Sequence, residues 1–138
     1  MKSIKTLILI TAALALGACA TTRLTAPLPD YTGSGATTLY IQRPSGFTGS
    51  AIVTHIVFDG ELLGVIGSGE YWELSVAPGK HMIGTWETQR QIILLPRKTA
   101  CYSTGFEGLT GRSWIRQAEH CPPPKSWKLA AESASLKR

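Results

Sequence analysis

The chain has 138 residues, of which 43% are hydrophobic and 17% charged, and its formal net charge is +5. This length suits one domain of ordinary size with a modest core. The basic residues form no dense run, since Arg97-Lys98 and Lys137-Arg138 are only pairs, and we therefore expect no nucleic-acid binding.

The first 18 residues have the pattern of a secretory signal peptide. A short basic start that contains Lys2 and Lys5 precedes an almost wholly apolar run from Thr6 to Leu16. This run is too short for a comfortable transmembrane helix, which needs about 20 residues. Loss of residues 1–18 would leave 120 of the 138 residues and, because two lysines leave, lower the net charge from +5 to +3.

The sequence Leu16-Gly17-Ala18-Cys19 resembles the lipobox of bacterial lipoproteins. The resemblance implies cleavage before Cys19 and attachment of lipid to its sulfur, and several acyl chains on one cysteine anchor a protein stably. The alternative is an ordinary secretory signal that leaves Cys19 as a free thiol. In such lipoproteins an Asp after the cysteine favours the inner membrane, so Ala20 favours the outer membrane, facing the periplasm.

Two further cysteines, Cys101 and Cys121, remain after Cys19 is assigned to the lipid. An even pair in an oxidising compartment predicts a disulfide between them. The alternative is a pair of free thiols.

Residues 19–36 read as a lipidated cysteine followed by a flexible tether, because they are rich in Pro, Gly and Thr and show little apolar periodicity. From Thr37 onward, β-branched and aromatic runs alternate with turn signals such as Asp59-Gly60 and Pro78-Gly79. We expect strands at Thr37–Arg43, Ile52–Phe58, Glu61–Ile66, Glu70–Val76, Lys80–Thr88, Gln89–Leu95, Cys101–Glu107 and, more weakly, Ser113–Gln117.

Seven or eight short strands at this spacing predict an all-β fold, a small antiparallel β-sandwich over residues 37–121. Three consecutive prolines, 122–124, then end any strand and open a tail of residues 122–138. The tail has two interpretations, a short helix over Ser126–Lys137 or a last edge strand at residues 127–129.

The tryptophans are the most suggestive side chains for binding. Trp72 and Trp86 fall on strand faces that point inward, so we expect both in the core. Trp114 lies close to Arg112 and Arg116, and this group is the candidate surface for a sugar ring or a protein partner.

No catalytic or metal-binding set stands out. The sequence lacks a G-x-S-x-G motif, and its histidines, His55, His81 and His120, are far apart in sequence. We expect no catalytic residues, no metal site and no cofactor.

Several turn and strand motifs resemble those of the DUF2846 family of small bacterial lipoproteins, which is similar in pattern to PEGA-type β-sandwiches. They are residues 39–44 (LYIQRP), 56–66 (IVFDGELLGVI), 69–71 (GEY) and 76–81 (VAPGKH), within about Thr37–Glu107. The resemblance implies a β-sandwich and an envelope location, without a mechanism.

The function expected from these patterns is that of a lipid-anchored, non-catalytic binding or scaffolding module in the cell envelope. Its partners would be the membrane, through Cys19, and an envelope protein. One alternative is a module that binds a glycan, either peptidoglycan or another polysaccharide. Another is an accessory lipoprotein of an envelope-spanning secretion or conjugation machine.

Overall fold

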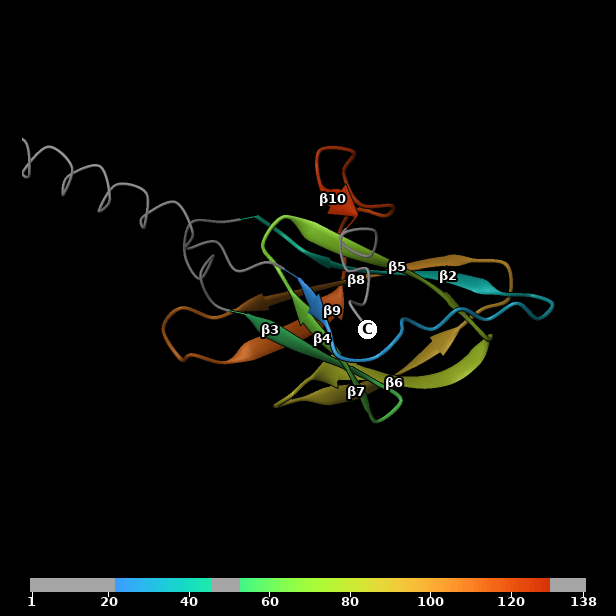
Figure 1. The fold of residues 1–138 in the computed structure, drawn as a ribbon, viewed down its shortest axis with the longest axis horizontal. Helices are drawn as coiled ribbons and strands as arrows, with labels where there is room; N and C mark the ends of the chain where they lie inside the picture. The colour runs from blue at the N-terminus through green and yellow to red at the C-terminus, as the bar shows by residue number, and fades with distance from the viewer. Residues whose placement is uncertain (1–21, 46–52, 130–138) are drawn as a thin grey trace, which may run out of the picture.

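Two five-stranded sheets face each other and form a β-sandwich, as predicted (Figure 1). The structure is a computed structural model and describes residues 22–45 and 53–129. The first sheet has the order β1-β4-β3-β6-β7 and the second the order β10-β5-β2-β8-β9. The bounds are Arg23–Leu24 (β1), Thr37–Arg43 (β2), Thr54–Phe58 (β3), Glu61–Ile66 (β4), Glu70–Val76 (β5), Gly79–Thr85 (β6), Gln89–Leu94 (β7), Thr99–Phe106 (β8), Ser113–Gln117 (β9) and Lys128–Leu129 (β10). The first sheet is antiparallel, whereas the prediction of antiparallel pairing is wrong for part of the second sheet, because β2 pairs in parallel with β8 and β10 in parallel with β5.

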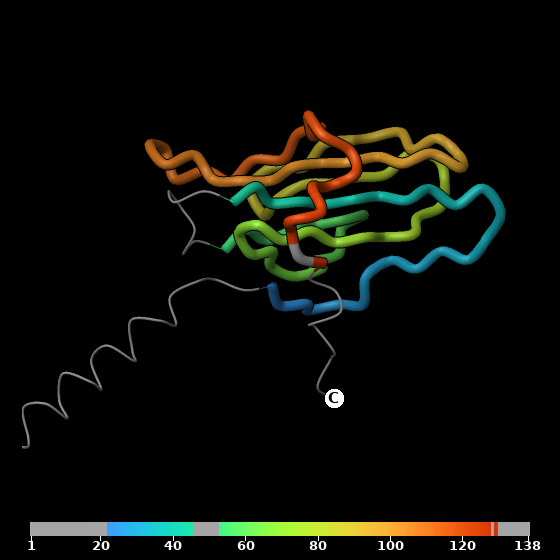
Figure 2. Tube along the Cα trace, turned by 90° about the horizontal axis from the view of Figure 1, so that it is seen from above, coloured from blue at the N-terminus to red at the C-terminus, as the bar shows by residue number. Residues whose placement is uncertain are grey.

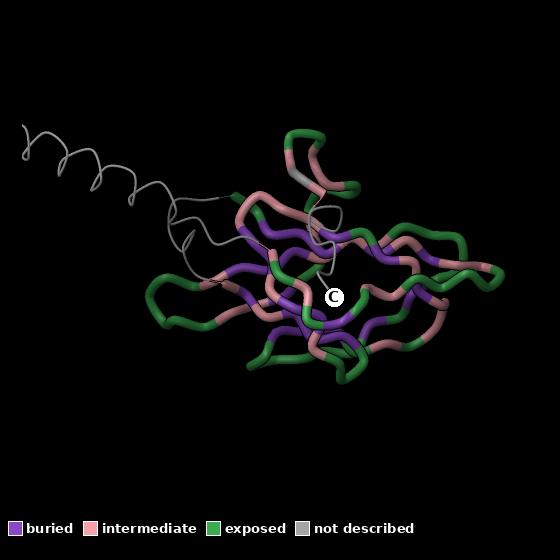
Figure 3. Tube along the Cα trace, in the orientation of Figure 1, coloured by how far each residue is buried: buried purple, intermediate pink, exposed green. Residues whose placement is uncertain are grey.

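The alternation of apolar side chains places the core between the sheets. On the second sheet Leu39 of β2 pairs with Leu74 of β5, and Ile41 pairs with Trp72, all of them buried. The first sheet contributes the facing apolar side chains Ile56, Leu63, Ile66, Ile83, Ile92 and Leu94. Figure 3 shows the buried stretches on the strands and the exposed residues in the connections. The described ranges contain no helix long and apolar enough to cross a membrane.

Four strands, β2, β4, β5 and β9, have the predicted limits residue for residue. β6, however, ends at Thr85 instead of Thr88, because the amide of Thr85 donates to the carbonyl of Thr88 at 2.8 Å and closes a hairpin there. Trp86 is therefore a hairpin residue, and the prediction that it packs in the core is wrong, since 67% of it is exposed.

The turn at Asp59-Gly60 has the predicted hairpin geometry. Both residues have positive φ, 48° and 82°, as a type I′ turn requires. The Asp59 carboxylate also accepts from the amide of Met82 at 2.8 Å and lies 2.7 Å from Nδ1 of His81. The turn between β3 and β4 is thus fastened to β6.

The interpretation of residues 19–36 as a flexible tether is wrong for residues 22–36, which pack against the sandwich. β1 pairs antiparallel with β4, Ala26 is buried, and Leu24 and Leu28 pack against the core. Further along, the amide of Tyr31 donates to the carbonyl of Ser75 at 2.9 Å. The apolar side chains of Leu24, Ala26 and Leu28 account for this docking. Residues 19–21 lie outside the described ranges.

The last described segment, residues 118–129, crosses the outer face of the second sheet and is called here the C-terminal strap (red in Figures 1 and 2). Its Cys121 forms the predicted disulfide with Cys101 of β8. Its end, β10, pairs in parallel with β5, on the far side of β2. Lys128 and Leu129 are therefore strand, as the edge-strand interpretation predicted, and the rest of the alternative helix, 130–137, lies outside the described residues.

Candidate functional site

A pocket of about 230 Å³ lies between the C-terminal strap and the outer face of the second sheet. We call it the strap pocket. It exists because the disulfide and β10 hold the strap at two points across β8, β2 and β5. Its lining residues come from β2 and the residue after it, from β8, β9 and the strap: Gln42, Pro44, Ser103, Trp114, Arg116, Gln117, Glu119, His120, Pro124 and Trp127.

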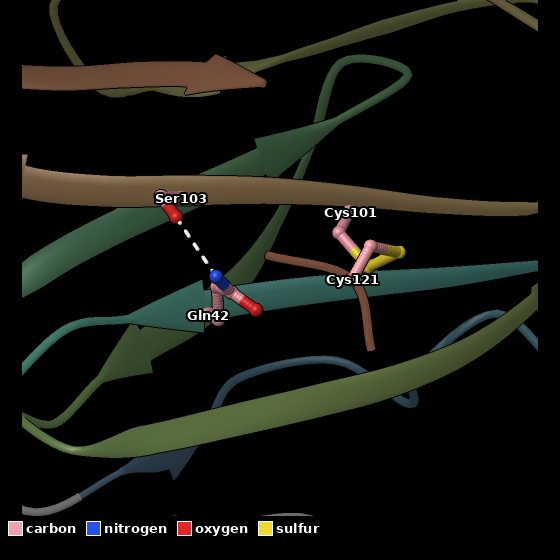
Figure 4. Close-up of a disulfide and its surroundings, with 4 residues drawn as sticks. All are labelled: Gln42, Cys101, Ser103 and Cys121. Atoms are coloured by element: carbon pink, nitrogen blue, oxygen red, sulfur yellow. Dashed lines mark hydrogen bonds between the residues drawn. A yellow bond between two sulfur atoms is a disulfide. The ribbon is translucent and has the colours of Figure 1, made fainter. Parts of the chain in front are cut away.

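Gln42 and Ser103 are the buried polar residues of the pocket. They are direct partners in the parallel pairing of β2 with β8, and Nε2 of Gln42 donates to Oγ of Ser103 at 3.0 Å (Figure 4). Only 3% of Gln42 is exposed, and its Oε1 has no hydrogen-bond partner among the described residues. A buried acceptor left unpaired costs about 1–3 kcal/mol, so pairing with a donor that reached it would be favourable.

Trp114 and Trp127 give the pocket its aromatic surface. Trp114 of β9 is paired with Gly105 of β8, and its ring lies directly over that glycine. A Cβ at position 105 would come within 2.4 Å of the indole. The guanidinium carbon of Arg116 lies 4.3 Å from the centre of the Trp114 ring, which is a cation–π contact. Gly105 and Arg116 therefore fix the ring from two sides.

The predicted binding group is brought together in part. Trp114 and Arg116 line the strap pocket, whereas Arg112 lies in the loop before β9 and outside the lining. The backbone carbonyl of Arg112 accepts from the amide of Glu107 at 2.9 Å, so this residue closes the loop. Cys101 and Cys121 support the pocket through their disulfide, and Cys19 lies outside the described residues.

Sequence reasoning missed Gln42 and Ser103, and it did not single out Trp127 among the suggestive tryptophans. The composition of β2 gives no signal for Gln42, because Thr37, Thr38 and Arg43 of the same strand are polar as well. The pairing of β2 with β8 and the path of the strap join residues about 60 positions apart, since Gln42 and Ser103 are separated by 61. Short-range patterns carry no information on such pairings.

The charges at the pocket are of both signs. Arg116 and Glu119 line it together with His120. On the same outer face of β2, burial raises the pKa of Tyr40, and the nearby Glu73 and Tyr71 raise it further, so the phenol stays neutral. On the opposite face of β2, burial lowers the pKa of Arg43, an effect that Glu70 opposes. Because Arg116 and Glu119 carry opposite charges, the pocket lining favours a ligand without a strong net charge.

The three histidines lie in different places. His55 packs edge-to-face with Trp86, His81 contacts Asp59, and His120 lines the strap pocket. Within the described ranges no group of three or more His, Cys, Asp or Glu side chains could hold a metal ion. What the strap pocket offers chemically is an aromatic surface, a buried amide acceptor and balanced charges.

Comparisons of the chain with protein-family models, with curated proteins and with solved structures find no match. The resemblance to the DUF2846 family therefore stays a prediction, and the functional argument rests on the geometry of the strap pocket and on the N-terminal sequence.

Proposed function

We propose that the chain is a lipid-anchored, non-catalytic module of the cell envelope that binds an uncharged segment of a glycan in the strap pocket. The observation that carries this proposal is the buried, unpartnered Oε1 of Gln42 in a pocket lined by two tryptophans. The unpaired acceptor supports a binding role for the pocket, because buried polar groups in folded proteins are nearly always hydrogen-bonded.

Sugar rings fit these features better than other neutral ligands. Their hydroxyl and amide groups are donors for an amide oxygen, and their apolar C–H faces stack on indole rings. A volume of about 230 Å³ is below the range of about 300–1,000 Å³ that is usual for drug-sized ligands. The pocket accordingly suits a single ring of a longer chain, with the neighbouring rings outside.

Anchoring through Cys19 is supported by the lipobox-like sequence, and Ala20 in place of Asp supports the outer membrane. An outer-membrane lipoprotein that faces the periplasm would meet peptidoglycan there. Lipid on the sulfur of Cys19 holds the domain at the membrane, and the strap pocket provides the specificity. The two parts of the proposal are tested separately.

The glycan is tested by co-sedimentation of the purified protein with purified peptidoglycan sacculi. We expect the protein to pellet with sacculi and Trp114→Ala to remain in the supernatant, because the indole supplies the stacking surface. Trp86→Ala is the matched control, since it removes an exposed tryptophan outside the strap pocket. Equal pelleting of Trp114→Ala and the unchanged protein would refute binding at this pocket.

The anchor is tested by metabolic labelling with a radioactive fatty acid. The unchanged protein should take up label, and Cys19→Ser should take up none because no thiol remains to carry diacylglycerol. The matched control is Cys121→Ser, which removes a cysteine but keeps the lipobox. Label on the Cys19→Ser protein would exclude this anchor.

A second candidate function, a scaffold for an envelope protein, is favoured by strand β7. This strand is at the edge of the first sheet, with 64% of Ile93 exposed and 58% of Leu95, just after its end. Edge strands of this kind accept an added strand from a partner. An accessory role in a secretion or conjugation machine would use the same edge. A photo-crosslinker at position 93 should then capture one defined protein in intact cells, and capture of none would count against the scaffold.

A further inference from the structure

Three strand connections that are distant from one another in sequence lie at one end of the sandwich. β4 and β6 are both antiparallel to β3, so they end on the same side as each other. β2 ends where β5 begins, and β8 runs parallel to β2. The connections after β4, β6 and β8 therefore lie at one end of the molecule, on the left in Figure 1. We call this the β6–β8 end.

The first described residue, Thr22, is fastened to the β6–β8 end. Its amide donates to the carboxylate of Glu70 at 3.0 Å, and its hydroxyl donates to the same carboxylate. The amide of Gly67 donates back to Oγ1 of Thr22 at 3.3 Å. Gly67 lies in the β4–β5 connection and Glu70 begins β5. The chain therefore enters the domain at this end.

Two large apolar side chains project from the same end into solvent. Trp86, in the β6–β7 hairpin, is 67% exposed, and Leu109, in the β8–β9 loop, is 99% exposed. Among the large exposed hydrophobic residues of the described chain, Leu109 has the highest exposure and Trp86 the next. Both side chains project from the end at which the chain enters the domain, which places them beside the proposed anchor on Cys19.

The β6–β7 hairpin and the β8–β9 loop are held in place by contacts with neighbouring residues. The rings of Trp86 and His55 pack in an edge-to-face arrangement, with 5.5 Å between the ring centres. The Glu87 carboxylate accepts from the amide of Ser113 at 2.9 Å and from its hydroxyl at 3.2 Å. These bonds join the β6–β7 hairpin to the start of β9. Trp86 is therefore presented by a braced surface, which reduces the entropy lost on binding.

From this placement we infer that the β6–β8 end rests on the bilayer that holds Cys19, with Trp86 and Leu109 in its interfacial layer. The inference rests on the proposed lipidation of Cys19. Three residue steps separate Cys19 from Thr22, a span of about 10 Å at most. An anchored domain is thus kept at the membrane surface with the β6–β8 end as its nearest part. Tryptophan favours the membrane–water interface, where its ring is buried and its N–H stays hydrated.

Fluorescence quenching by brominated phospholipids tests this inference. The full-length protein is purified from membranes, its acylated mass is verified, and it is placed in phosphatidylcholine vesicles with or without bromine on the acyl chains. We expect bromine to quench part of the tryptophan emission and Trp86→Phe to lose most of that quenching. The matched control, Trp72→Phe, should keep it because Trp72 is fully buried between the sheets.

Quenching that is absent in the acylated protein, or unchanged in Trp86→Phe, would overturn the inference while leaving the anchor intact. A purified protein whose mass shows no acyl groups and that fails to float with vesicles would overturn the anchor, and the membrane contact with it. Leu109→Ser supplies a second readout that keeps every tryptophan. We expect it to reduce the quenching of Trp86, since the loop beside it would be less deeply inserted.

Discussion

At the scale of single residues, the unpaired acceptor of Gln42 lowers the stability of the fold and has a proposed role in binding. Its buried Oε1 lacks a partner, while its Nε2 is bonded to Ser103. An apolar residue of similar size would remove the unpaired acceptor and also the bond to Ser103. Removing the unpaired acceptor stabilises the fold and losing the bond to Ser103 destabilises it, and each effect is worth no more than about 3 kcal/mol.

We expect Gln42→Leu to change the free energy of unfolding by no more than about 1 kcal/mol, because the two effects largely cancel. The same variant should bind sacculi at least about tenfold more weakly, the equivalent of about 1.4 kcal/mol, since the acceptor for the sugar is gone. Urea unfolding and co-sedimentation measure the two quantities. A large loss of stability with unchanged binding would identify Gln42 as purely structural.

At the scale of elements, the C-terminal strap depends on its disulfide. The bridge joins Cys101 to Cys121 over a separation of 20 residues, and a loop of that length is worth about 3 kcal/mol in the chain-entropy description. The same bridge holds Pro124 and Trp127 over the pocket. Stability and binding are therefore linked through one covalent contact.

The double variant Cys101→Ser and Cys121→Ser should lose about 3 kcal/mol of stability and should also bind sacculi more weakly. Thermal unfolding and co-sedimentation at a temperature where the variant remains folded measure the two effects. Reduction of the unchanged protein by dithiothreitol should reproduce both. Full binding by the folded double variant would mean that the pocket forms without the strap.

The docking of β1 depends on a glycine in the neighbouring strand. Gly64 pairs with Leu24 and has a φ of 146°, and a Cβ on it would lie 2.1 Å from the carbonyl oxygen of Arg23. This contact involves backbone, so it cannot be relieved by turning a side chain. A substitution at position 64 must therefore push β1 away from β4.

We expect Gly64→Ala to release β1 and to speed tryptic cleavage after Arg23, which pairing with β4 protects in the unchanged protein. Gly60→Ala is the matched control, because Gly60 also has positive φ but nothing lies within 4 Å of a Cβ there. The rate of cleavage at Arg23, followed by mass spectrometry, decides the outcome. Equal rates in the two variants would show that β1 is held by other contacts.

At the scale of the whole molecule, the sequence predicts what is local and misses what is long-range. Period-two alternation sets the face of each side chain, so the limits of β5 and its inward Trp72 follow from residues 70–76 alone. Trp86 was misassigned because the Thr85–Thr88 hairpin ends β6 early. β1 has only two residues, too few for a pattern. The strap pocket requires the pairing of β2 with β8, which no local signal contains.

The short distance between the proposed anchor and the domain leads to a prediction for the whole molecule. A flexible Gly-Ser spacer of about 12 residues, inserted between Thr21 and Thr22, would have a root-mean-square span of about 20 Å. The spacer lowers the effective concentration of the β6–β8 end at the bilayer, because the domain can then move away while its lipid stays inserted. We expect the quenching of Trp86 by brominated lipids to fall, with acylation and binding to sacculi unchanged.

The matched control carries the same spacer after Arg138, where it adds mass without changing the distance to the anchor. If both proteins are quenched as strongly as the unchanged one, the loops hold the membrane by their own affinity and the short connection to Cys19 contributes nothing. If only the protein with the N-terminal spacer loses quenching, that connection keeps the β6–β8 end on the membrane.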